Sequence, residues 1–267
     1  MEGNVEGRLL MSPDFQIVGA TKCCTSTLHY WLSKHPMISM SSPKETPVID
    51  QRFQNWGDEY LKYFPDYSSN GNKIFGDANP NLFIIPWAPD RIKIANPNTK
   101  IIICIREAVE RCYSHWKYFH LMRPGREPES FSKTIVDNLK DFNLNKFKSE
   151  ADYMPYVCEK WGNYRKMYVE TGCYANYIKK YLDDFEVKVV LKDDLEENPE
   201  LALNSIQKFL NVPVFDLHNN RIRNVGCAVD KEKGDLETLQ YLKTFYRSWN
   251  ESLSDMIGIN LIKRWVL

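Results

Sequence analysis

One stretch of the chain combines a cation, hydroxyls and backbone amides in a pattern suited to binding an anion. It is residues 19–27, GATKCCTST, and it directly follows the apolar run 15–19. A strand that leads through such a loop into a helix directs backbone N–H groups and the positive end of the helix dipole at a ligand. Lys22 adds a point charge, and three following side chains add hydroxyl donors: Thr25, Ser26 and Thr27. The stretch therefore predicts a phosphate-type site.

This loop differs from the loop that binds nucleoside triphosphates with magnesium. That loop ends in Gly-Lys-Ser/Thr, which places the lysine on the β- and γ-phosphates and the hydroxyl on the metal. Here Lys22 precedes the first hydroxyl by three residues, and no Gly-Lys pair occurs in the chain. A phosphate or phosphosulfate without a metal fits better. The alternative is a helix capped by Thr25 or Ser26 beside a solvated lysine.

A second cation and hydroxyl follow another buried run. The β-branched stretch 100–105 leads into Arg106, and Ser114 comes eight residues later on an expected helix. An arginine at the carboxyl end of a strand and a serine on the next helix can bind one phosphate together. Two such units in one sheet predict a ligand that carries two separate anionic groups.

The expected elements alternate between strand and helix. Strands are expected at 15–19, 73–75, 100–105 and 185–191, and helices at 25–35, 108–122, 130–142, 161–184 (with an interruption at Gly172), 199–210 and 236–257. This order predicts an α/β fold, a parallel sheet with helices on both faces and its ligand at the carboxyl ends of the strands. A single domain is expected over residues 1–267, with a short flexible tail at about 1–12.

Composition excludes several classes of protein. Among 267 residues, 35 Lys+Arg balance 35 Asp+Glu, which argues against a strongly basic nucleic-acid binder. No apolar run approaches the ~20 residues of a membrane span, and the start lacks a secretory signal. Seven cysteines, an odd number, favour a reduced cytoplasmic protein, the alternative being a lumenal Golgi domain cut from an anchored parent. The spacing of His and Cys predicts no metal site. The oligomeric state stays open.

Both anion segments resemble the sulfotransferases that use 3′-phosphoadenosine 5′-phosphosulfate (PAPS). Residues 15–38 are similar to the 5′-phosphosulfate loop of that family, and residues 100–118 to its 3′-phosphate segment. Lys44-Glu45, the stretch 123–131 and Gly172-Cys173-Tyr174 resemble the heparan-sulfate and bacterial branch. The resemblance covers about residues 15–265 and implies the P-loop-like sulfotransferase fold, PAPS as donor, PAP as product and no metal.

The resemblance also implies roles for individual residues. Lys22 would bridge the 5′-phosphate and the leaving oxygen, and Glu45 would be the general base. The other residues implied to bind the donor are Cys23, Cys24, Thr25, Ser26, Thr27, Arg106, Ser114, Tyr174, Lys231, Lys233 and Gly234. Without the resemblance, Glu45 would be interpreted as a surface residue beside Lys44.

Some positions depart from the family pattern. Cys23 and Cys24 replace the usual glycines, so a positive φ there would strain the loop. Cysteines at a helix N-terminus can be reactive, but packing of the loop is the preferred interpretation. Ala78 stands where the branch carries an active-site lysine, which raises the neighbouring Asp77 as an alternative base. Asp77 could instead cap the turn at Asn79-Pro80.

Three classes of function remain open. The preferred hypothesis is a PAPS-dependent sulfotransferase acting on a hydroxyl or amine of a small natural-product type molecule, the alternative acceptor being a heparan-type saccharide. The second class is a nucleotide-dependent phosphotransferase. The third is a non-catalytic PAP-binding module. Tyr153, Tyr156, Trp161 and Tyr164 are candidates for an acceptor pocket, but burial against the sheet would explain them equally well.

Overall fold

A parallel β-sheet forms the centre of the molecule. The computed structural model describes residues 11–67, 73–122, 127–157, 167–217 and 233–265. Its strands are β1 (Phe15–Gly19), β2 (Ile38–Met40), β3 (Ile74–Ala78), β4 (Lys100–Ile105) and β5 (Val187–Leu191). They lie in the order β2-β3-β1-β4-β5, and every pairing is parallel. The predicted α/β fold is confirmed.

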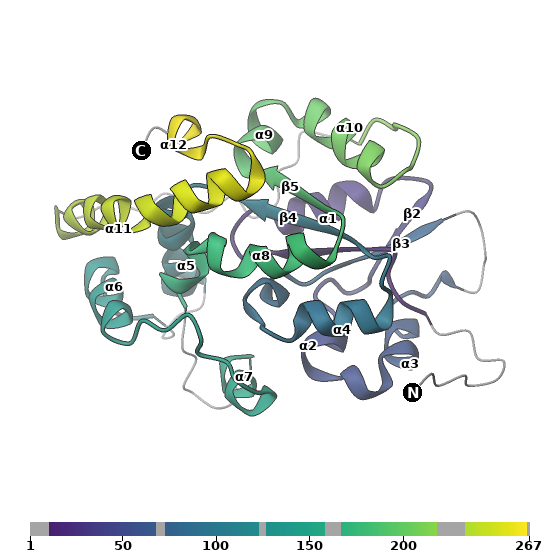
Figure 1. The fold of residues 1–267 in the computed structure, drawn as a ribbon, viewed down its shortest axis with the longest axis horizontal. Coiled ribbons are helices and arrows are strands. Elements are labelled where there is room, and N and C mark those ends of the chain that lie inside the picture. The colour runs from purple at the N-terminus through teal and green to yellow at the C-terminus, as the bar shows by residue number, and fades with distance from the viewer. Residues whose placement is uncertain (1–10, 68–72, 123–126, 158–166, 218–232, 266–267) are drawn as a thin grey trace.

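Helices cover both faces of this sheet (Figure 1), with α1 and α10 on one side and α4 and α8 on the other. The first half of the chain contributes α1 (Thr25–Leu32), α2 (Val48–Gln51), α3 (Trp56–Leu61), α4 (Ala88–Ala95), α5 (Ala108–Met122) and α6 (Phe131–Lys140). The second half contributes α7 (Glu150–Val157), α8 (Tyr174–Asp184), α9 (Lys192–Glu197), α10 (Pro199–Phe209), α11 (Lys233–Ile257) and α12 (Leu261–Arg264). The 3₁₀ turns are η1 (Phe53–Asn55), η3 (Pro80–Ile84) and η5 (Glu170–Gly172).

The central strands are buried on both faces, which explains their continuous apolar sequence. Ile17 pairs in register with Ala78 on one side and with Ile102 on the other, and all three side chains are buried. Burial on both faces is what an all-parallel sheet requires. At the end of β1, a Cβ on Gly19 would lie 2.4 Å from the Cβ of Phe83, so only glycine fits where the chain turns into the anion loop.

The structure differs from the expected elements in several places, and the short helices α2, α3, α4, α7, α9 and α12 were not expected. The helix expected from residue 161 begins only at Tyr174: residues 167–173 form turns and η5, and 161–166 lie outside the described residues. The Val169 carbonyl accepts from the Gly172 N–H (3.0 Å), three residues on, and also from the Tyr246 hydroxyl (2.7 Å), so the chain forms a turn here. The strand β2 was not expected. Residues 1–10 of the expected tail lie outside the described residues, and Met11 is buried.

Candidate active site

The sequence-predicted anion segments meet at the carboxyl edge of the sheet. The loop after β1 is fixed to β4 because the Ala20 N–H donates to the Cys104 carbonyl (2.7 Å). The Lys44-Glu45 loop is fixed to β3 because the Glu45 N–H donates to the Ala78 carbonyl (3.0 Å). Arg106 follows β4 directly. Three loops that lie far apart in the sequence are therefore held at one edge, as expected for a ligand site in a parallel sheet.

The loop 20–24 presents an uncapped helix N-terminus. Cys24 is the N-cap of α1, and its side chain makes no capping hydrogen bond. The first N–H groups of a helix have no partner within the helix, so they are available to an anion here. Among the three predicted hydroxyls, Thr25 and Thr27 are buried and Ser26 is half-buried. The hydroxyl of Thr21 is also buried and makes no hydrogen bond with the described residues, although sequence reasoning did not single it out.

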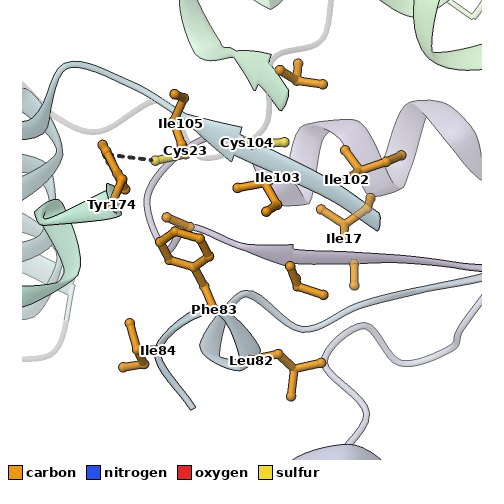
Figure 2. Close-up of a cluster of buried hydrophobic side chains, with 14 of the residues drawn as sticks. Ile17, Cys23, Leu82, Phe83, Ile84, Ile102, Ile103, Cys104, Ile105 and Tyr174 are labelled. Carbon is orange, nitrogen blue, oxygen red and sulfur yellow. Dashed lines mark hydrogen bonds between the residues drawn. The ribbon is translucent and has the colours of Figure 1, made fainter. Parts of the chain in front are cut away.

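The Tyr174 side chain contacts both anion segments. Its hydroxyl donates to the Arg106 carbonyl (2.9 Å). The same hydroxyl lies 3.7 Å from the Cys23 sulfur, and Figure 2 marks this contact with a dashed line. Both the tyrosine and Cys23 are fully buried. Tyr174 was predicted to bind the donor, and the structure places it beneath the loop. These contacts hold the loop against the residue after β4, and donor binding by Tyr174 stays a prediction.

The two cysteines differ in backbone conformation. Cys24 adopts a left-handed conformation (φ 64°), whereas Cys23 does not. A non-glycine residue in that region costs roughly 1–2 kcal/mol, so the strain expected from the missing glycines falls on Cys24. Burial raises the pKa of the Cys23 thiol and raises that of Cys24 to about 11. Both thiols therefore stay protonated at neutral pH, in agreement with the packing interpretation.

Lys22 is a partly buried cation directed at the same edge. Its ammonium lies 4.2 Å from the centre of the Tyr118 ring, a cation–π contact. Burial is the main cause that lowers the pKa of Lys22 to about 8, and the nearby positive charges of Arg106 and Arg111 contribute to the same shift. Cations that lie close together repel one another, and a bound anion would relieve that repulsion, so this cluster favours an anionic ligand.

The second anion segment contains one buried cation that the sequence analysis missed. Arg106 pairs with Glu110 on α5 (3.3 Å), and Ser114 is half-buried one turn further along the helix. Arg111 is fully buried, donates to the Tyr168 carbonyl and forms no ion pair with a described residue. Its type and position within Arg-Glu-Ala-Val-Glu-Arg were visible, but its burial was not.

The two candidate bases lie in different environments. Glu45 is on the loop after β2, its side chain is 48% exposed, and its Oε1 lies 2.5 Å from the Lys44 ammonium. Its backbone is left-handed (φ 69°), a strain of roughly 1–3 kcal/mol that is typical of functional positions. Asp77 is buried. Its carboxylate accepts hydrogen bonds from Ser41 (2.7 Å), from Thr46 (2.6 Å) and from the Ala78 N–H.

These contacts make Asp77 the support of the Glu45 loop. Ser41 and Thr46 lie on either side of Lys44-Glu45, and both hydroxyls donate to Asp77. Burial raises the pKa of Asp77, and the hydroxyl donors and the Lys44 charge counteract part of that rise. Asp77 does not cap the turn at Asn79-Pro80, because the Asn79 side chain itself accepts from the Asn81 N–H (3.1 Å).

Substitution of Asp77 by Ala is expected to lower the free energy of unfolding by about 2–4 kcal/mol. The substitution leaves two buried hydroxyl donors without an acceptor, at about 1–3 kcal/mol for each unsatisfied group. Urea unfolding measures the change. Asp255→Ala, on the exposed surface of α11, is the matched control and should change stability by less than about 0.5 kcal/mol. Equal stability of the two variants would contradict the supporting role of Asp77.

Several predicted residues cannot be placed. Lys231 lies outside the described residues, as do Trp161 and Tyr164, and the side chains of Tyr156 and Lys233 are not described either. Gly234 is exposed at the start of α11. The next residue, Asp235, accepts from the Ser132 N–H (3.2 Å), so it fixes the start of α11 to α6. Tyr153 is buried, and its hydroxyl donates to Asp50 (2.9 Å).

Two further observations concern membranes and metals. Among the described helices, none is both long enough and apolar enough to cross a bilayer. In the same part of the chain, no three His, Cys, Asp or Glu side chains gather as a metal site would require.

Fold and site together define an α/β protein whose cationic loops meet at the carboxyl edge of a parallel sheet. The family model for the sulfotransferase domain matches residues 12–244. The crystal structure of a sulfotransferase from Alicyclobacillus acidocaldarius matches with a TM-score of 0.69 and 25% identity over 94% of this chain and 97% of that one. The chain therefore belongs to the sulfotransferase family and is a transferase of that type.

Curated relatives extend the comparison. The membrane-associated sulfotransferase kil1 of Dictyostelium discoideum is 24% identical over 95% of this chain and 67% of its own length. The human bifunctional heparan sulfate N-deacetylase/N-sulfotransferase 2 is 23% identical over 92% of this chain. The chain spans only 29% of the length of that human relative. Because the first of these relatives is named as membrane-associated, the cytoplasmic location expected for this chain stays a prediction.

Proposed function

We propose that this protein transfers a sulfuryl group from PAPS to a hydroxyl or amine of a small-molecule acceptor. The observation that carries the proposal is the convergence of two cationic segments on neighbouring strands. The Lys22 loop follows β1 and Arg106 follows β4, and these strands pair directly. Two fixed anion sites at one edge suit a donor with phosphates at both its 5′ and 3′ positions better than a triphosphate.

The residues present fit this donor. The uncapped start of α1, the unpartnered Thr21 hydroxyl and Lys22 would hold the 5′-phosphosulfate. Arg106 and Ser114 would hold the 3′-phosphate, with Arg106 released from Glu110. When bound, PAPS supplies the sulfuryl group and a phosphate leaving group. Positioned cations and amides stabilise the negative charge that grows during such a transfer.

The remaining chemistry belongs to two side chains of this chain. Protonated Lys22 donates to the oxygen on which negative charge develops, and its partial burial strengthens that interaction. The Glu45 carboxylate accepts the proton of the acceptor group, and the Lys44 ammonium lies 2.5 Å from its Oε1. Asp77, with its oxygens already bonded, holds the Glu45 loop.

The acceptor has two candidate classes. The balanced net charge of the chain favours a small, weakly charged molecule over a long polyanion. The heparan sulfate relatives favour a saccharide, which is the alternative acceptor. A turnover screen with PAPS against alcohols, amines and desulfated oligosaccharides separates the two classes.

Thermal unfolding with 3′,5′-ADP, 5′-ADP and ATP–Mg²⁺ at equal concentration tests the donor. A ligand present at about 100 times its Kd stabilises a protein by about 2.7 kcal/mol, or roughly 5–10 °C for a chain of this size. A shift with 3′,5′-ADP that exceeds the others supports the proposal. A shift with ATP–Mg²⁺ and none with 3′,5′-ADP would favour the phosphotransferase instead.

The affinity for 3′,5′-ADP is expected to fall as the pH rises above about 8. Free Lys22 loses its proton near that pH because of its burial and of the Arg106 and Arg111 charges. The bound phosphates raise its pKa, so binding takes up a proton. The Kd should change little between about pH 7 and 7.5, where the phosphates of the ligand are fully ionised, and should rise up to about tenfold per unit above pH 8.

Calorimetry in two buffers of different ionisation enthalpy measures that proton uptake at pH 8.5–9, a range chosen to lie about one unit above the pKa of Lys22. Cys23 and Cys24 face the same lysine, but their raised pKa values keep them protonated there. Lys22→Arg, which stays charged throughout, should abolish the uptake. An unchanged uptake in that variant would assign the proton to another group.

A further inference from the structure

A lysine outside the predicted site lies at the same edge of the sheet. Lys192 is the first residue of α9 and directly follows β5. Ile105 and Leu191 are register partners and the last residues of β4 and β5, so Arg106 and Lys192 are the first residues after two neighbouring parallel strands. Adjacent strands lie about 4.8 Å apart. The two cationic residues therefore leave the sheet side by side, where β4 and β5 end together in Figure 1.

The two cations are held in the same way. Arg106 pairs with Glu110, and Lys192 pairs with Glu196, in each case four residues further along. Each cationic side chain is only 15% exposed, whereas Glu110 is 52% and Glu196 36% exposed. Ion pairs of this partly exposed kind contribute little to stability. A doubly charged phosphate can therefore replace both carboxylates at little cost.

Lys192 also faces the phosphosulfate loop. Of the charges that lower the pKa of the Cys24 thiol, Lys192 has the largest effect, and Arg106 and Glu196 act on the same thiol. Cys24 is the N-cap of α1. Lys192 therefore acts on the loop after β1 and follows β5, the strand that pairs with β4 on the side away from β1.

We propose that Lys192 binds the 3′-phosphate of the donor together with Arg106, and that Glu196 holds Lys192 while the site is empty. The inference rests on the proposed function. It adds Lys192 to the 3′-phosphate site. It also predicts that Glu196 has the opposite effect on the affinity for the ligand. A carboxylate that competes with the ligand for Lys192 weakens binding, so its removal should strengthen binding.

Calorimetry with 3′,5′-ADP and 5′-AMP tests this role, because the two ligands differ only in the 3′-phosphate. Lys192→Met should weaken 3′,5′-ADP by about 10- to 100-fold, the size of one charge-assisted hydrogen bond, and should change 5′-AMP less than about twofold. Glu196→Gln should tighten 3′,5′-ADP by about two- to threefold, the size of a partly exposed ion pair. Lys192→Arg, which keeps the charge, should restore most of the affinity.

Lys179→Met is the matched control, since Lys179 is an exposed lysine on α8 that also pairs with an acidic residue four positions on. It should leave both affinities unchanged. The inference would be overturned if Lys192→Met lowered the affinities for both ligands equally, or lowered neither. The proposed function would still stand if the wild-type protein bound 3′,5′-ADP. A wild-type protein that does not bind 3′,5′-ADP would overturn both. Glu196→Gln tests the pair even if a Lys192 variant does not fold.

Discussion

Glu45→Gln is expected to reduce sulfuryl transfer about 10²- to 10⁴-fold, the contribution of a positioned general base, while 3′,5′-ADP still binds. The amide is nearly the same size as the carboxylate but cannot accept the acceptor proton. Both side chains tolerate the left-handed backbone at this position equally poorly, so stability should change little. Glu45 lies on the loop after β2, whereas the helix N-terminus that would hold the donor follows β1.

Single-turnover transfer from PAPS and calorimetry with 3′,5′-ADP give the two measurements. Glu251→Gln, at an exposed position on α11, is the matched control. Full activity in Glu45→Gln would show that Glu45 is not the base. Asp77 would then be the candidate base, and Asp77→Asn would test it. Loss of binding as well as transfer would mean that Glu45 supports the fold of the site. A wild-type protein that binds 3′,5′-ADP but never transfers would favour the non-catalytic module.

The anion segments were predictable because their signals are local. A buried apolar run that ends in Gly19 or Arg106 marks the carboxyl end of a strand, and the helix 108–122 was predicted with the bounds that α5 has. Parallel strands then bring such ends to one edge without further information. Lys192 was open to the same reasoning, since it follows the expected strand 185–191, but only the pairing of Ile105 with Leu191 places it beside Arg106.

Other features depend on contacts between distant residues. The Tyr174 hydroxyl meets Arg106 and Cys23 across 68 and 151 residues, and no pattern near Tyr174 indicates those partners. The role of Asp77 depends on Ser41 and Thr46 in the same way. Secondary structure was missed where elements are short. The strand β2 has three residues and α2 has four, too few to show a period.

Lys22→Met is expected to reduce transfer about 10²- to 10³-fold, as for removal of one donor to a developing negative charge. Affinity for 3′,5′-ADP should fall about 10- to 100-fold, because a charge-assisted hydrogen bond to phosphate is lost. Lys34→Met is a close control: Lys34 belongs to the turn that ends α1, its ammonium lies 4.9 Å from the Tyr30 ring, and it is exposed. Transfer within twofold of wild type in Lys22→Met would refute the assignment.

Stability gives this variant a readout that separates function from folding. The lowered pKa of Lys22 means that the folded protein disfavours its charged form, through burial and through repulsion from Arg106 and Arg111. Methionine removes that cost while it keeps the length of the side chain and its contact with Tyr118. The melting temperature of Lys22→Met without ligand should therefore equal or exceed that of the wild type, as is known for buried charges that apolar residues replace. A lysine that lowers stability yet is required for transfer is a residue kept for its chemistry. A variant that is both inactive and unstable would instead make Lys22 a structural part of the loop.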